Sequence, residues 1–204
     1  YTAVLAMPNV VPAPSDLSSL EVMEQIIRKD AAIKVIPYGT ITKEQSGRGS
    51  LSAMDETAGR VASFSDDGKG VQDEALMRQA MIKAAALDRV ITAHCENEAY
   101  PAKDARSEWT EAVRDIQLTE ETGAALHICH VSSARTLEAV REAKARGINV
   151  TCETAPHYIA FSEEDVTDDG KFKMNPPIRS ERDKAAILEA VKDGTIDMIA
   201  TDHA

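Results

Sequence analysis

Strand-like and helix-like segments alternate along the whole sequence, which predicts an α/β fold with parallel strands. Seven short apolar runs are separated by amphipathic segments and loops within 204 residues, roughly one run per thirty residues. Polar side chains follow several of these runs directly, so the carboxyl ends of the strands carry most of the candidate chemistry. A chain of this length buries one substantial core, and we expect a single domain over residues 1–204.

In the first half of the sequence, segments with helical spacing of apolar residues alternate with short apolar runs typical of strands. Leu20, Met23 and Ile27 fall on one face of a helical segment, as do Leu76 and Ala80 further along. Between these segments lie short runs of β-branched and apolar residues bounded by turn residues. The elements expected in order are strand 2–7, helix 18–30, strand 33–36, strand 61–64, helix 73–88 and strand 90–93.

Capping residues mark the helices of the second half. Ser133 stands at a preferred N-cap position, and Gly147 stands where a glycine ends the same helix. Ser180 opens another helix with Asp183 at the capping-box position and Gly194 past its end. The remaining elements expected are helix 107–122, strand 125–131, helix 133–146, strand 149–154, a helix between positions 180 and 194, and strand 196–201.

The polar residues at strand ends favour a (β/α)8 TIM-like barrel over a doubly wound open sheet. A barrel gathers all of its strand ends into one ring, whereas an open sheet would spread them along an edge. No G-x-G-x-x-G follows a strand, which weakens the dinucleotide-binding form of the open sheet. Seven predicted strands do not close an eight-stranded barrel, so we expect one strand to be missing from this chain. The strand-end residues are Asn9, Asp67, His94, His130 and Asp202.

Four of these side chains form a candidate metal site. Imidazole nitrogens and carboxylate oxygens suit Zn²⁺, and also Mn²⁺, Fe²⁺ or Co²⁺. Taken singly, each residue has a plainer interpretation, as a hydrogen-bonded core histidine or as part of an Asp-Asp-Gly turn. Their common position after four different strands favours metal binding, while His127 and His157 are expected to be structural. The expected ligands are Asp67, His94, His130 and Asp202.

Charge and cysteine content exclude other classes of protein. The formal net charge of −11 and the scattered basic residues argue against a nucleic-acid-binding protein. No run approaches 18 consecutive apolar residues, so no membrane span is expected. Three cysteines without short spacing do not form a disulfide framework, which favours a reducing, cytoplasmic location.

Seven short motifs follow one another along the chain. They are Met7-Pro8-Asn9, Phe64-Ser65-Asp66-Asp67-Gly68, Ala93-His94-Cys95-Glu96, His130-Val131-Ser132-Ser133, Cys152-Glu153-Thr154-Ala155-Pro156-His157-Tyr158, Lys173-Met174-Asn175-Pro176-Pro177-Ile178-Arg179 and Thr201-Asp202-His203-Ala204. In this order they resemble the motifs of the longer type of bacterial dihydroorotase. The resemblance implies an amidohydrolase-superfamily barrel covered roughly from strand two to strand eight, with two Zn²⁺ ions or other divalent metals. It implies Asp67 as the bridging ligand on strand four, His94 on strand five, His130 on strand six and Asp202 on strand eight.

The sequence departs from this family pattern at both ends. The His-x-His-x-Arg segment of the first strand is absent, which removes two expected metal ligands and an arginine for the substrate carboxylate. The chain stops at Ala204, before a further substrate-contacting histidine, and the connection from Glu96 to Trp109 is shorter than in relatives. We therefore expect a partial barrel whose active site is incomplete in this chain alone.

The activity implied by the resemblance is reversible hydrolysis of the cyclic amide L-dihydroorotate to N-carbamoyl-L-aspartate, a step of pyrimidine biosynthesis. Two metals would activate water and polarise the ring carbonyl, and Asp202 would transfer the proton to the leaving nitrogen. Asn9 would bind the substrate carboxylate and Asn175 the ring, because an amide offers both donors and an acceptor.

Two alternatives stay open. The first is a hydantoinase or allantoinase, although those enzymes generally bridge their metals with a carbamylated lysine where this sequence has Asp67. The second is an inactive dihydroorotase-like scaffold for aspartate transcarbamoylase, although such chains usually lose the histidine ligands that are present here. A homodimer is a further expected partnership.

Overall fold

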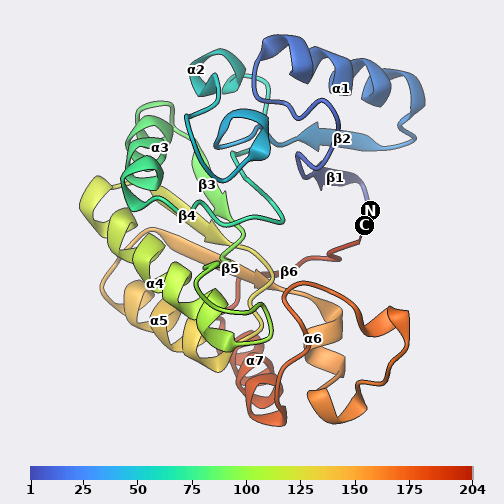
Figure 1. The fold of residues 1–204 in the computed structure, drawn as a ribbon, viewed down its shortest axis with the longest axis vertical. Coiled ribbons are helices and arrows are strands. Elements are labelled where there is room, and N and C mark those ends of the chain that lie inside the picture. Colours follow the sequence, from blue (N-terminus) through green and yellow to red (C-terminus); the bar gives the residue numbers. More distant parts are fainter. Residues whose placement is uncertain (204) are drawn as a thin grey trace. The chain divides into compact units, whose positions relative to one another are not determined.

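The computed structural model describes residues 1–203, which fall into two compact units (Figure 1). The first comprises residues 1–94 and 122–125, and the second comprises residues 95–121 and the described residues from 126 onward. Both units are α/β with parallel strands, so the predicted alternation is confirmed. The single domain over residues 1–204 stays a prediction. Within residues 1–203, no helix combines the length and apolarity that a bilayer span requires.

The first unit is built on parallel segments that end near the candidate ligands. Strand β1 (Ala3–Ala6) pairs in parallel with β2 (Lys34–Pro37), with Val4 opposite Val35, and β3 (Val90–Ala93) lies further along the chain. The predicted strand 61–64 is wrong as a strand, because only Phe64 forms parallel bridges, to Gly39 and to Ile91. This single bridge residue still links β3 to the segment that follows β2.

Caps and short helices complete the first unit. Helix α1 (Leu17–Asp30) begins after Asp16, whose carboxylate accepts from the backbone N–H of Ser19 in a reciprocal capping box. Asp73 caps α3 (Glu74–Ala86) by accepting from the backbone N–H groups of Ala75 and Leu76, without a reciprocal capping box. The sequence pattern did not indicate α2 (Met54–Thr57) or the 3₁₀ turn Lys43–Gln45.

The second unit holds the other strands and the longest helix. Strands β4 (Ala125–Ile128), β5 (Val150–Thr154) and β6 (Met198–Ile199) are parallel in that order. The helices are α4 (Ala105–Thr122), α5 (Ala134–Ala145), α6 (Pro156–Ala160) and α7 (Glu181–Asp193), with 3₁₀ turns at Glu163–Asp165 and Gly170–Phe172.

The predicted caps of α5 and α7 are confirmed, with one correction. Ser133 and Ser180 accept from the backbone N–H groups of Thr136 and Asp183, and Gly194 ends α7 with a φ of 80°. Asp183 does not close a capping box on its own helix. Its carboxylate accepts instead from the backbone N–H of Ala134 at 2.8 Å, so it joins the starts of α5 and α7.

Two strands of the second unit are shorter than predicted. The strand predicted at 125–131 ends at Ile128, and the last predicted strand, 196–201, is regular only at Met198–Ile199. His130 has a φ of 34° and Asp202 a φ of 50°, and such left-handed backbone cannot continue a strand. The alternation of side chains between the two faces of β4 therefore does not extend to His130.

Helix α4 carries a buried acidic pair in its interior-facing turn. Glu111 and Asp115 are 2% and 0% exposed, and Arg114 lies 3.0 Å and 2.7 Å from their carboxylates. Each carboxylate has one oxygen without a hydrogen-bond partner among the described residues. Burial is the largest cause that raises the pKa of Glu111 to about 8 and that of Asp115 to about 6, and mutual repulsion adds to the rise for Glu111.

We expect Glu111→Gln to change how the stability of the fold depends on pH. Because the pKa of Glu111 is raised to about 8 on folding, the native state holds a proton that the unfolded chain releases, and stability falls as pH rises from about 4.5 to 8. At pH 8 the free energy of unfolding of the variant should exceed that of the parent by up to about 4 kcal/mol, because the pKa of Glu111 rises from 4.5 to about 8 and each unit corresponds to about 1.4 kcal/mol. At pH 4.5 the two proteins should differ little.

The exposed residue Glu142 provides the matched control, because Glu142→Gln removes the same charge from a solvated helix surface. Urea denaturation at both pH values measures the effect. Equal stability of the Glu111→Gln variant and the parent at pH 8 would contradict this account.

Candidate metal centre

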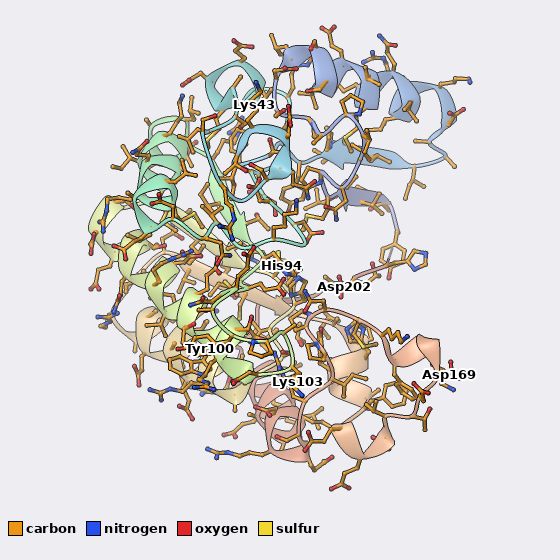
Figure 2. The ribbon with its side chains drawn as sticks, in the orientation of Figure 1. Lys43, His94, Tyr100, Lys103, Asp169 and Asp202 are labelled. Atoms are coloured by element: carbon orange, nitrogen blue, oxygen red, sulfur yellow. The ribbon has the colours of Figure 1, made fainter. Side chains whose placement is uncertain are left out.

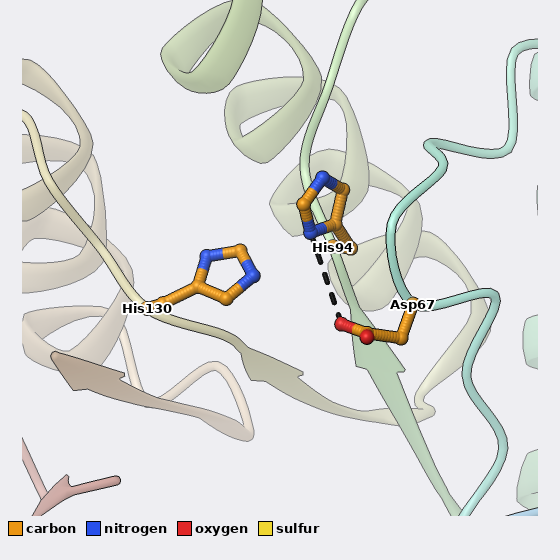
Figure 3. Close-up of side chains that lie close together, drawn as sticks. All are labelled: Asp67, His94 and His130. Atoms are coloured by element: carbon orange, nitrogen blue, oxygen red, sulfur yellow. Dashed lines mark ion pairs between the residues drawn. The ribbon is translucent and has the colours of Figure 1, made fainter. Parts of the chain in front are cut away.

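Asp67 and His94 form an ion pair within the first unit. His94 directly follows β3 and is 4% exposed, while Asp67 follows the bridge residue Phe64. Their Nδ1 and Oδ1 atoms are 3.9 Å apart, drawn as the dashed line in Figure 3. Two ligands of one tetrahedral zinc, each about 2.1 Å from the ion, lie about 3.4 Å apart. The pair is therefore close to the separation that a shared ion requires.

The neighbouring aspartates have different environments, although the sequence places them side by side. Asp66 is 1% exposed, and its carboxylate accepts from the backbone N–H groups of Ile41, Thr42 and Gly47 and from the Thr42 hydroxyl. Burial is the largest cause that raises the pKa of Asp66, and these hydrogen bonds oppose it. Asp66 thus holds the loop 41–47, while the half-buried Asp67 keeps an oxygen facing His94.

Asn9 lies against Asp67 rather than standing free at its strand end. Its side-chain Nδ2 donates to Asp67 Oδ2, and its Oδ1 accepts from Gln45 Nε2. Gln45 Nε2 also donates to the backbone carbonyl of Asp67 at 2.6 Å. The residue predicted to bind a substrate carboxylate is therefore part of a short amide chain that ends on Asp67.

His130 lies in the second unit, just past β4, and is 4% exposed. Its left-handed φ turns the chain toward α5, and the turn is fixed from both sides. Val131 donates its N–H to the Glu153 carbonyl at 2.7 Å, and Ser132 and Ser133 donate theirs to the Glu108 carboxylate at 3.2 and 3.1 Å.

Glu108 of α4 anchors this turn. Besides the two backbone bonds, its carboxylate accepts from the hydroxyls of Ser132 and Thr136. Arg179 lies 3.9 Å from the same carboxylate and donates to Ser132 Oγ at 3.1 Å and to the Lys103 carbonyl at 2.8 Å. A buried charge is tolerated only where such partners surround it, so this cluster fixes the backbone next to His130.

Asp202 and Asn175, the other predicted site residues, have partners within the second unit. Asp202, labelled in Figure 2, is exposed and has its Oδ2 3.7 Å from Nε2 of His157. Burial lowers the pKa of His157 and the Asp202 charge opposes the shift. Asn175 donates its Nδ2 to the Glu96 carboxylate at 2.8 Å. His157, predicted to be structural, is thus the ionisable neighbour of Asp202.

Sequence reasoning missed Gln45 and Glu108. Both side chains form hydrogen bonds to the backbone of a loop, and neither residue directly follows a strand. Neither is part of a periodic pattern of apolar residues. No sequence pattern singled out either residue, because Gln45 lies in the polar segment 43–49 and Glu108 in an amphipathic helix.

The chain matches the family model described as "Dihydro-orotase-like" over residues 1–112. It is 42% identical over 222 aligned residues to a dihydroorotase of Fusobacterium nucleatum and 40% identical over 222 to one of Anoxybacillus flavithermus. Each alignment covers 100% of this chain and 52% of the relative. The chain therefore spans about half the length of the curated relatives it matches.

Solved structures show the same fold. An L-hydantoinase (dihydropyrimidinase) from Arthrobacter aurescens aligns with a TM-score of 0.84 at 21% identity, over 99% of this chain and 50% of that one. A dihydroorotase from Campylobacter jejuni aligns with a TM-score of 0.76 at 14% identity, over 100% of this chain and 61% of that one. The predicted fold class, an α/β TIM-like barrel of which this chain covers a part, is confirmed. With identities of about 40% over its entire length, the chain belongs to the dihydro-orotase-like family.

Proposed function

We propose that the natural protein carrying this sequence is a dihydroorotase, which hydrolyses the cyclic amide of L-dihydroorotate reversibly to N-carbamoyl-L-aspartate in pyrimidine biosynthesis. The observation that carries the proposal is the 42% identity to a dihydroorotase over 100% of this chain. Asp67 supports it, because this family places aspartate where hydantoinases generally carry a carbamylated lysine.

Asp67, His94, His130 and Asp202 are the proposed ligands of a divalent metal centre, with two Zn²⁺ ions expected. Asp67, His94 and His130 each offer one ligand atom, and imidazole and carboxylate groups fit zinc. The separation of 3.9 Å between the Asp67 and His94 atoms supports this fit. When bound, the metals supply an activated water and a polarised carbonyl.

The remaining proposed roles belong to side chains at the loops. Asp202 takes the proton of the attacking water at its carboxylate and delivers it to the leaving ring nitrogen, a role that its exposed position beside His157 permits. Asn9 binds the substrate carboxylate and Asn175 the ring. Both amides are exposed, so each can exchange a present hydrogen bond for one to substrate.

The alternatives make different predictions. Similarity to hydantoinase structures at 18–21% identity supports the fold and leaves the substrate open. An inactive scaffold for aspartate transcarbamoylase would not need Asp67, His94 and His130 together, and all three are present. The proposed location is cytoplasmic, supported by three buried cysteines in the thiol form. A homodimer and an association with aspartate transcarbamoylase stay predictions.

We expect the natural full-length protein to open dihydroorotate at least about 100-fold faster than hydantoin or allantoin, measured as kcat/KM on each substrate. Incubation with a chelator should abolish the activity, and added Zn²⁺ should restore it. A preference for hydantoin would establish the rival enzyme. Unchanged activity after complete removal of metal would contradict the proposal that the reaction depends on a metal centre.

A further inference from the structure

Gln45 occupies a position in the first unit that neither the strand pattern nor the proposed ligands explain. Its side-chain nitrogen donates two hydrogen bonds, one to Asn9 Oδ1 and one to the backbone carbonyl of Asp67 at 2.6 Å. Asn9 in turn donates to Asp67 Oδ2. The two bonds use both hydrogens of the Gln45 amide, so that Gln45 contacts Asp67 directly and through Asn9.

The chemistry of the acceptors fixes the orientation of both amides. The Asp67 carbonyl can only accept, so the Gln45 atom beside it must be the NH₂ group. The Asp67 carboxylate accepts in the same way, so the Asn9 atom beside it must be Nδ2, which leaves Asn9 Oδ1 to accept from Gln45. Only a donor with two hydrogens at position 45 completes this chain.

The hydrogen bonds from Asn9 and Gln45 distinguish the two carboxylate oxygens of Asp67. Oδ2 is held by Asn9, while Oδ1 lies 3.9 Å from His94 Nδ1. The amide chain therefore restricts rotation of the carboxylate and presents Oδ1 on the side of the histidine. A ligand held in advance loses less conformational freedom when an ion binds, and residues that orient metal ligands are worth about 10–100-fold in metal affinity.

The loop that carries Gln45 is built for this placement. It starts at Lys43, labelled in Figure 2, and its consecutive residues Glu44 and Gln45 have left-handed φ values of 57° and 54°. Such backbone costs about 1 kcal/mol or more per non-glycine residue, so neighbouring contacts must hold it. Asp66 does so by accepting from Thr42 and Gly47 on either side of the turn.

We propose that Gln45 is a positioning residue that orients the Asp67 carboxylate, through its backbone carbonyl and through Asn9, for metal binding. Asp66 fixes the loop, the loop places Gln45, and Gln45 fixes the ligand that follows Asp66 in the sequence. The inference rests on the proposed function, in which Asp67 is a metal ligand.

The test compares two substitutions in the natural full-length protein. Gln45→Met keeps the length of the side chain and removes both donors, and Gln45→Glu places an acceptor opposite two acceptors. Glu44→Gln is the matched control, because it changes the adjacent exposed side chain in the same turn. Zn²⁺ affinity is measured by competition with a chelator, ligand geometry by the visible spectrum of the Co²⁺-loaded protein, and folding by the Tm without metal.

Both Gln45 variants should lose about 10–100-fold in Zn²⁺ affinity and change the Co²⁺ spectrum, with a metal-free Tm within about 2 °C of the parent. Glu44→Gln should match the parent in all three. An affinity loss below about threefold, an unchanged Co²⁺ spectrum, or an equal loss in Glu44→Gln would overturn the role of Gln45. A fall in metal-free Tm that accompanies the whole affinity loss would assign a merely structural role. A parent protein that binds no Zn²⁺ would instead overturn the proposed function.

Discussion

Replacing Asp202 with asparagine is expected to lower kcat for dihydroorotate by about 10³-fold, because the proposed proton carrier is lost and an amide cannot accept the proton. Asparagine is the right substitution at this position. Asp202 has a φ of 50°, a left-handed conformation that asparagine adopts readily and alanine does not. The backbone beyond β6 should therefore stay in place, and the effect can be assigned to the carboxylate.

The measurement must separate the two proposed roles of Asp202, since a metal ligand and a proton carrier can both reduce kcat. Metal content and KM are determined on the same samples as kcat. Retained metal with a lowered kcat would support the proton role, and lost metal would support ligation. Asp168→Asn, which removes an exposed carboxylate from the loop before the 3₁₀ turn Gly170–Phe172, is the control and should behave as the parent. A kcat within about tenfold of the parent would contradict both roles.

The fold could be predicted from sequence wherever a segment with a periodic apolar pattern also forms a regular helix or pairs continuously with a neighbouring strand. The strand predicted at 90–93 is β3 itself, and the helix predicted at 73–88 contains α3. The segment 61–64 failed for a different reason. Val61 and Phe64 are buried, as their apolar character indicated, but burial alone does not supply the continuous pairing that a strand needs.

The residues of the candidate site also differ in whether the sequence could point to them. His94 and His130 could be proposed as candidates because each follows an apolar run that does form a strand, whereas Asp67 follows the predicted strand 61–64, of which only Phe64 forms bridges. Gln45 and Glu108 could not, because their roles depend on loop backbone and on partners distant in the sequence. A glutamine in a polar turn and a glutamate in an amphipathic helix both read as solvated residues, and only the folded chain distinguishes them from the rest.

The adjacent aspartates should respond in opposite ways to the same substitution. Asp66→Asn places an NH₂ group among buried N–H donors from Ile41, Thr42 and Gly47, and should reduce the free energy of unfolding by about 3 kcal/mol. Asp67→Asn changes a half-buried group that still accepts from Asn9, and should leave the stability of the metal-free protein within about 0.5 kcal/mol.

Metal binding should show the reverse order. Asp67→Asn removes a proposed ligand, so its Zn²⁺ affinity should fall by more than the about 10–100-fold that follows loss of a supporting residue. Asp66→Asn should reduce affinity only as far as the loop 41–47 loosens. Each variant is the matched control for the other, since both remove one charge from the same dipeptide. Urea denaturation without metal and Zn²⁺ competition measure the two effects. Equal loss of affinity in both variants would mean that the pair acts as one structural unit, whereas opposite responses would separate the residue that builds the loop from the residue that holds the ion.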